Sequence, residues 1–228
     1  MRRIVFALLL AAAACGSPKP VVKPVADTEP VVDPKKKSQT WGELGVLNVG
    51  KVDAVFAGLK DALTACNERG NKFAAGSITY AIRVDHQGAV KYAYAKDTEL
   101  GDREIERCML NLIRKATWPT PEGGDDGIIE KPITFPDREE RPPEDWTADK
   151  VLPAVGKLKA KLQKCREGHT GMFRATMIVD KSGKVMSVGI ASPDDKGEAA
   201  IDCMADALKT LKLPSPGSWP ARVSFELP

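Results

Sequence analysis

An internal repeat is the feature of this 228-residue chain that most limits its fold. Sliding the sequence along itself by 99 residues superposes two sets of five apolar positions, each set spaced 4, 3, 4 and 3 residues apart. Such spacing is typical of the buried face of an amphipathic helix, so each copy is expected to open with a helix that carries a buried cysteine. The positions are Val52, Phe56, Leu59, Leu63 and Cys66 in the first copy, and Val151, Val155, Leu158, Leu162 and Cys165 in the second.

The rest of each copy predicts two strands, a second helix and a third strand. After the first cysteine the shift between the copies falls to 95 residues, as a four-residue loop deletion would produce. Alternating apolar residues on both sides of the turns DHQG and DKSG indicate a hairpin. A second helix with Cys108 or Cys203 follows and is stopped by prolines, and last strands are expected at 128–135 and 221–227.

This order of elements predicts an α+β fold made of two tandem domains. Three strands and two amphipathic helices in a small copy bury their apolar faces as one sheet with both helices on one face. We expect such a three-stranded antiparallel sheet in each domain. The domains are predicted at 41–137 and 148–228, with a charged, proline-containing linker at 138–147 between them.

The N-terminal residues indicate export from the cytoplasm. Two arginines precede an apolar run of 11 residues at 4–14, which is typical of a signal peptide and too short to span a membrane. The alanines before Cys15 resemble a bacterial lipobox, in which the cysteine is lipidated, and Gly16 resembles sorting to the outer membrane. Cleavage at an A-x-A site without lipidation is the alternative. Residues 1–14 are thus predicted as signal peptide and 15–40, rich in proline, valine and lysine, as a tether.

Four cysteines remain besides Cys15, an even number that fits disulfides in an oxidising periplasm. Free, buried cysteines are the alternative. The repeat alone does not choose among the three possible pairings. If each copy folds on its own, one pairing is favoured, because the two helices of one copy must pack side by side on the same sheet face. We therefore expect Cys66 to pair with Cys108, and Cys165 with Cys203.

The element order resembles the C-terminal domain of TonB, and more closely the AgmX/PglI C-terminal domain family. The motifs of this resemblance are Cys66 at the end of the first helix, the strand-turn-strand GSITYAIRVDHQGAV, the run Glu106-Arg-Cys108, and WPTPEGG before the last strand. The second copy keeps both cysteines, DKSGKV and LPSP, but lacks the Gly-Gly pair. The resemblance implies an adaptor in an envelope or motility complex that binds envelope proteins or peptidoglycan, with no catalytic residues and no cofactor.

The sequence gives little support for nucleic-acid binding, metal binding or catalysis. A net charge of +3 without a basic stripe argues against nucleic acid. His86 in the DHQG turn has a lysine as its counterpart, and His169 in a loop has no counterpart, so neither is expected to bind a metal. Asp97, Glu99 and Asp102 precede the second helix, and Thr98 or Asp102 is expected to cap it rather than to act as an acid or base. We expect no enzyme; a small-ligand carrier, or an unrecognised hydrolase, is the alternative.

The last strand of each copy is the expected site of partner binding. A three-stranded sheet has edges with unpaired backbone groups, and such edges recruit partner strands. Pro132 removes one donor from the first copy's edge, so the second copy offers the better candidate. The residues of that edge are Val223, Ser224, Phe225 and Glu226. The sequence thus predicts a non-enzymatic periplasmic adaptor that reaches the membrane through lipidated Cys15.

Overall fold

The computed structural model of the chain describes residues 44–228, which pack as one unit. The predictions for the signal peptide, for Cys15 and for the tether at 15–40 lie outside these residues. Within 44–228, no helix has the length and apolar character needed to cross a membrane.

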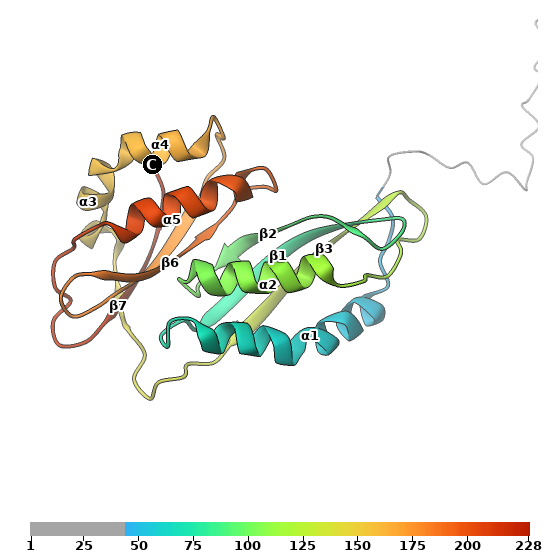
Figure 1. Cartoon of the computed structure of the whole chain (residues 1–228), viewed down its shortest axis with the longest axis horizontal. Coiled ribbons are helices and arrows are strands. Elements are labelled where there is room, and N and C mark those ends of the chain that lie inside the picture. The colour runs from blue at the N-terminus through green and yellow to red at the C-terminus, as the bar shows by residue number, and fades with distance from the viewer. Residues whose placement is uncertain (1–43) are drawn as a thin grey trace, which may run out of the picture. The chain divides into compact units, whose positions relative to one another are not determined.

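Repeat 1, residues 44–135, follows the predicted order of elements. The strands form an antiparallel sheet in the order β2-β1-β3, and both helices cover one face of it (Figure 1). The elements are α1 (Val49–Arg69), β1 (Gly76–Asp85), β2 (Val90–Thr98), α2 (Arg103–Lys115) and β3 (Asp126–Phe135). The three-stranded antiparallel sheet predicted for the first copy is therefore present.

Repeat 2, residues 144–228, has a four-stranded mixed sheet rather than the predicted three-stranded one. Its extra strand comes from the predicted linker and runs parallel to the last strand, giving the order β4-β7-β5-β6. The first helix is also divided at Leu158, two residues after the weak helix former Gly156. The elements are β4 (Glu144–Trp146), η1 (Ala148–Lys150), α3 (Leu152–Lys157), α4 (Lys159–Arg166), β5 (Arg174–Val179), β6 (Val185–Ala191), η2 (Gly197–Ala200), α5 (Ile201–Lys209) and β7 (Ala221–Glu226).

Helix α2 begins where the sequence predicts a cap. The carboxylate of Asp102 accepts hydrogen bonds from the backbone N–H groups of Glu104 and Ile105, at 2.9 and 3.3 Å. These two donors have no partner inside the helix, so the bonds stabilise its first turn. The cap also fixes the direction in which α2 points its first residues, Arg103 and Glu106, which matter for the contact between the repeats.

Each repeat has its own hydrophobic core and its own disulfide. Cys66 of α1 is bonded to Cys108 of α2, and Cys165 of α4 to Cys203 of α5. These are the pairs expected if each copy folds on its own, with sequence separations of 42 and 38 residues. In the chain-entropy model, closing loops of this size stabilises each repeat by roughly 4 kcal/mol.

Candidate functional site

Four strand edges decide where a partner strand can bind to this protein. The first sheet ends at β2 and β3, and the second at β4 and β6. An edge strand exposes backbone donors and acceptors that pair readily with another chain unless something covers them. The chain covers β2 and β6 with a contact between the repeats, uses the three-residue β4 to flank β7, and leaves most of β3 open.

Strand β7 is not the edge strand that the sequence predicts. It lies between β4 and β5, with Trp146 paired to Val223, and the backbone N–H of Glu144 donates to the carbonyl of Pro220 at 2.9 Å. The prolines before β4 favour the extended backbone that such pairing needs, which periodicity alone does not reveal. The remaining residues of the predicted site are also engaged: Ser224 bonds Thr176, Phe225 is in the core, and Glu226 pairs with Arg174 across the sheet.

The edges of β2 and β6 close each other at the contact between the repeats. The backbone N–H of Ser192, just after β6, donates to the carbonyl of Ala95 in β2 at 2.8 Å. A side chain of α2 also joins the two strands. The carboxyl of Glu106 accepts hydrogen bonds from the N–H of Ile190 in β6 at 3.3 Å and from the hydroxyl of Thr98 in β2 at 2.8 Å. Figure 1 shows α2 and β2 of repeat 1 facing β6 and α5 of repeat 2.

Two ion pairs across this contact join positions that are equivalent in the repeat. The shift of 95 superposes Arg103 on Glu198 and Arg107 on Asp202. The structure pairs the same residues, at 2.8 and 3.8 Å. Because the charges at equivalent positions are opposite, repeat 1 attracts repeat 2, whereas two copies of the same repeat would bring like charges together. The charge pattern therefore favours pairing of unlike repeats.

Arg103 is the buried member of this group. Its side chain is 7% exposed and bonds both Glu198, itself 12% exposed, and Asp202 at 2.7 Å. Burial alone would lower the pKa of Arg103, but Glu198 and Asp202 raise it above its ordinary value. Burial alone would raise the pKa of Asp202, but its bond to Arg103 holds the pKa lower than usual. Arg103 and Asp202 are therefore both charged at neutral pH.

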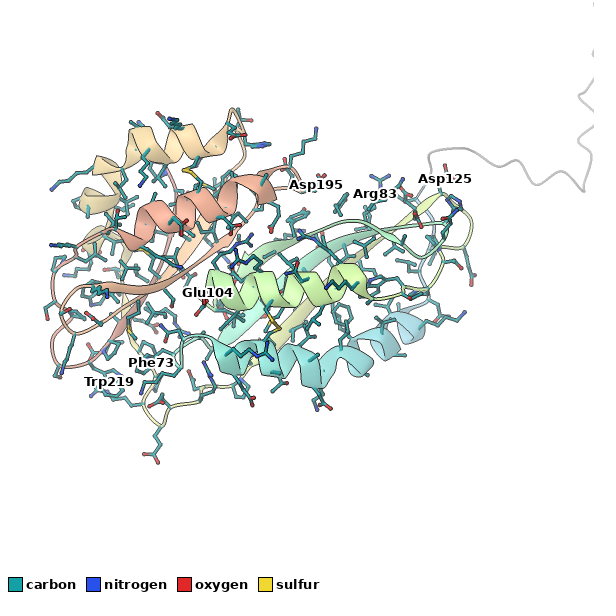
Figure 2. All side chains as sticks on the ribbon, viewed as in Figure 1. Phe73, Arg83, Glu104, Asp125, Asp195 and Trp219 are labelled. Carbon is teal, nitrogen blue, oxygen red and sulfur yellow. A yellow bond between two sulfur atoms is a disulfide. The ribbon has the colours of Figure 1, made fainter. Side chains whose placement is uncertain are left out.

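A second contact between the repeats is aromatic. Phe73 and Trp219 meet edge to face, with ring centroids 5.8 Å apart and planes at 84°, and Figure 2 shows the two side chains next to each other. Lys72 lies over the Phe73 ring and Arg141 over the Trp219 ring. Aromatic pairs of this geometry add to the free energy gained from their buried area. The repeats are thus held at two separate places.

Strand β3 is the open edge. At its beginning the chain itself makes one isolated bridge, where Leu44 pairs parallel with Asp126 and the N–H of Gly45 donates to the Asp126 carbonyl at 2.7 Å. The backbone groups of Asp126 therefore point away from β1, and by alternation so do those of every second residue after it. These outward residues are Ile128, Glu130, Pro132 and Thr134. None of them pairs with a further strand within 44–228.

The side chain of Asp126 anchors this end of the edge. Its carboxylate bonds Lys91 at 2.9 Å and Arg83 at 2.6 Å. Both cations lower the pKa of Asp126, Lys91 the more strongly, so the group is charged over the whole neutral range. The first residue of β3 is thus fixed to β1 and β2, and the open part of the strand extends from a rigid start.

A groove of about 630 Å³ runs beside the open edge, between α1 and β3. Its apolar wall includes Phe56 and Leu63 from α1 and Ile133 and Phe135 from β3. The cations of its lining are Lys60, Lys131 and Arg138, with Glu68 as the acid. The groove can therefore accept apolar side chains of a segment that lies along β3, and its rim favours acidic residues next to them.

The two acids and two histidines that the sequence offers as other candidates for chemistry have structural positions. Asp97 forms an ion pair with Arg174, and Glu99 accepts from the N–H of Ser77 at 2.8 Å. His86 lies in a turn, and the N–H of His169 donates to the carbonyl of Arg166. Among residues 44–228, no three His, Cys, Asp or Glu side chains are grouped in a way that could hold a metal ion.

Comparisons with protein-family models, with curated proteins and with solved structures found no match for this chain.

Sequence reasoning missed the residues of the contact between the repeats. The signal was present in the alignment of the two copies, where Glu106 superposes on the apolar Ile201 and where Arg103 and Arg107 superpose on acids. A charged residue at a position that is apolar in the other copy indicates a surface specific to one repeat. Such a difference identifies the contact only when both copies are compared position by position.

The ion pairs predict unequal effects for two alanine substitutions on α2. Arg103→Ala leaves the largely buried Glu198 with only the more distant Arg114, at 3.7 Å, and we expect it to lower the free energy of unfolding by about 3 kcal/mol. Arg107→Ala removes a cation that is 56% exposed and is expected to cost under about 1 kcal/mol. Urea denaturation of both variants measures the difference. Equal destabilisation would contradict the assigned role of Arg103.

Proposed function

We propose that this protein is a non-enzymatic adaptor of the bacterial envelope that binds an extended segment of another envelope protein along the edge of β3. The observation that supports this proposal best is an open strand edge next to an apolar groove. Strand addition uses the backbone for affinity and neighbouring pockets for the choice of side chains. Both parts are present at β3, and the site replaces the one expected at β7.

An extended protein segment fits this site better than peptidoglycan or a small ligand does. The outward backbone groups of β3 repeat at the two-residue spacing of a strand, which a peptide backbone matches and a glycan does not. A carrier of small molecules needs an enclosed cavity with several polar groups directed at the ligand. Here one polar lining residue, Asn67, already donates to the carbonyl of Ala74 at 3.1 Å.

The proline of β3 shapes how a partner segment would bind. Pro132 has no N–H, so one of the four outward positions accepts a hydrogen bond without donating one. Lys131 on the groove side is held by Asp53 at 2.6 Å and lies over the Phe56 ring. We infer that the partner segment carries apolar residues at alternate positions and at least one acidic residue near Lys60 or Lys131.

In this proposal, the N-terminal residues determine where in the cell envelope the protein is anchored. Cys15 is lipidated, the anchor lies in the outer membrane, and residues 15–40 tether the two repeats to it. The two repeats belong to the group of domains that resemble the TonB and AgmX/PglI C-terminal domains. An adaptor of this kind links the membrane to a protein partner in the periplasm, as in an envelope or motility complex.

The anchor is tested by metabolic labelling with a fatty-acid analogue in the cell that makes the protein. We expect label on the wild type and none on Cys15→Ser, because the thioether to the lipid requires the cysteine. Cys66→Ser serves as the control, since Cys66 lies in a disulfide, and it should keep the label. Label on Cys15→Ser, or none on the wild type, would contradict the anchor.

The β3 site is tested with a photocrosslinking amino acid at Glu130, an outward position of the edge, in the full-length protein. We expect the crosslink to map to one extended segment of an envelope protein. Thr134→Pro removes an outward N–H and should reduce the crosslink at least about tenfold, because one backbone hydrogen bond and its geometry are lost. Thr134→Ala keeps the N–H and is the matched control.

The reverse change strengthens the same test. Pro132→Ala supplies the missing N–H at the edge and is expected to increase the crosslink. Circular dichroism and intact disulfides verify that each variant folds. Crosslinks to peptidoglycan fragments alone, or equal yields for Thr134→Pro and Thr134→Ala, would reject strand addition at β3.

A further inference from the structure

Glu106 is an acid buried completely at the contact between the repeats. It lies on α2 of repeat 1, yet one of its oxygens bonds the N–H of Ile190 in repeat 2. The other oxygen bonds the hydroxyl of Thr98, whose carbonyl in turn accepts from the hydroxyl of Thr176 in repeat 2. Separation of the repeats would therefore move this carboxyl from a buried site toward water.

The surface of β6 is shaped around this carboxyl. Gly189 has no side chain, and a Cβ built there would overlap Oε1 of Glu106 and lie 2.9 Å from the backbone nitrogen of Asp102. The space that a side chain of β6 would fill is thus occupied by the acid of the other repeat. Ile201, the counterpart of Glu106 in repeat 2, is buried in its own core and makes no such bond.

The charged and titratable groups near Glu106 come from several elements. Asp102 and Arg103 lie on or before α2, Tyr80 comes from β1, and Glu198 comes from η2. Arg103 is already bonded to Glu198 and Asp202, so its charge is balanced by acids of repeat 2. The hydroxyl of Tyr80 is buried and has no hydrogen-bond partner among residues 44–228. Strand β6 supplies the N–H of Ile190 and the space at Gly189 to this site.

We propose that the contact between α2 and β6 is a proton-sensitive latch, in which protonated Glu106 holds the repeats together and its ionisation releases the edges of β2 and β6. The released edges are a second surface for an extended protein segment, masked while the latch is closed. The latch does not depend on the β3 site, which lies on the opposite edge of the first sheet.

The direction of the pH effect follows from the two states of the carboxyl. In the closed state burial raises the pKa of Glu106 to about 8, against 4.5 for the free group. A group with a raised pKa in the closed state binds its proton more tightly there, so closure is favoured at low pH. The closing equilibrium weakens as pH rises from about 5 to 8 and changes little above 8, where the acid is ionised in both states.

The latch is tested by amide hydrogen exchange of the full chain, measured by NMR between pH 5 and 9. The protection factors of Ile190 and Ser192 report on it, because both amides donate across the contact. We expect protection to fall up to about tenfold per pH unit between pH 5 and 8 and to level off above 8. Amides of the central strand β5 are the internal reference and should show no such slope.

Two variants separate the latch from other effects of pH. Glu106→Gln keeps the shape and cannot ionise, so its protection factors should stay level across the range. Glu104→Gln removes an acid of the same helix whose side chain is 74% exposed, and it should retain the wild-type slope. If Glu106→Gln does not fold, Gly189→Ala replaces it and should lower the protection of both amides at every pH.

Three outcomes would overturn the proposal. One is a level pH profile for the wild type, and another is a slope that Glu104→Gln removes or that survives in Glu106→Gln. The third is a parallel loss of protection in β5, which would show that the domain unfolds as a whole rather than opening at the contact.

Discussion

The contact between the two repeats is the interaction on which the rest of the structure depends. It places the buried cation Arg103 between two acids of the other repeat and the buried acid Glu106 against the edge of β6. A buried cation and a buried polar carboxyl are tolerated only when their hydrogen-bond or ion-pair partners are present. The contact therefore fixes which edges are closed, and the open edge at β3 is what remains.

The arrangement resembles a dimer built within one chain. Helix α2 meets η2 and α5, the corresponding segment of repeat 2, through equivalent positions, as the subunits of a twofold dimer do. Divergence of the two copies has put arginines on one side and acids on the other. A symmetric pair could not achieve this match, because each position would meet its own copy. Two linked copies can therefore close their edges against each other and still keep one edge free.

Much of the fold was predictable because apolar spacing and cysteines act locally. The heptad-like face ending at Cys66, the hairpin turns and the cap at Asp102 each depend on a few neighbouring residues. The pairing of β4 with β7 and the role of Glu106 were not predictable in this way. Both depend on residues far apart in the chain, and three residues such as Glu144–Trp146 are too short to show a period. Strand β7, which the sequence predicts as an edge, therefore lies inside its sheet.

The open edge at β3 is tested most directly by amide hydrogen exchange at the edges of β3 and β6 at neutral pH, without any partner. It predicts fast exchange for Glu130 and Thr134 on the outward side of β3. It predicts much slower exchange for Ile190 and Ser192 at the contact between the repeats, whose amides have acceptors in repeat 1. Equal protection of all four amides, or the reverse order, would contradict a chain that closes its other edges and leaves β3 open.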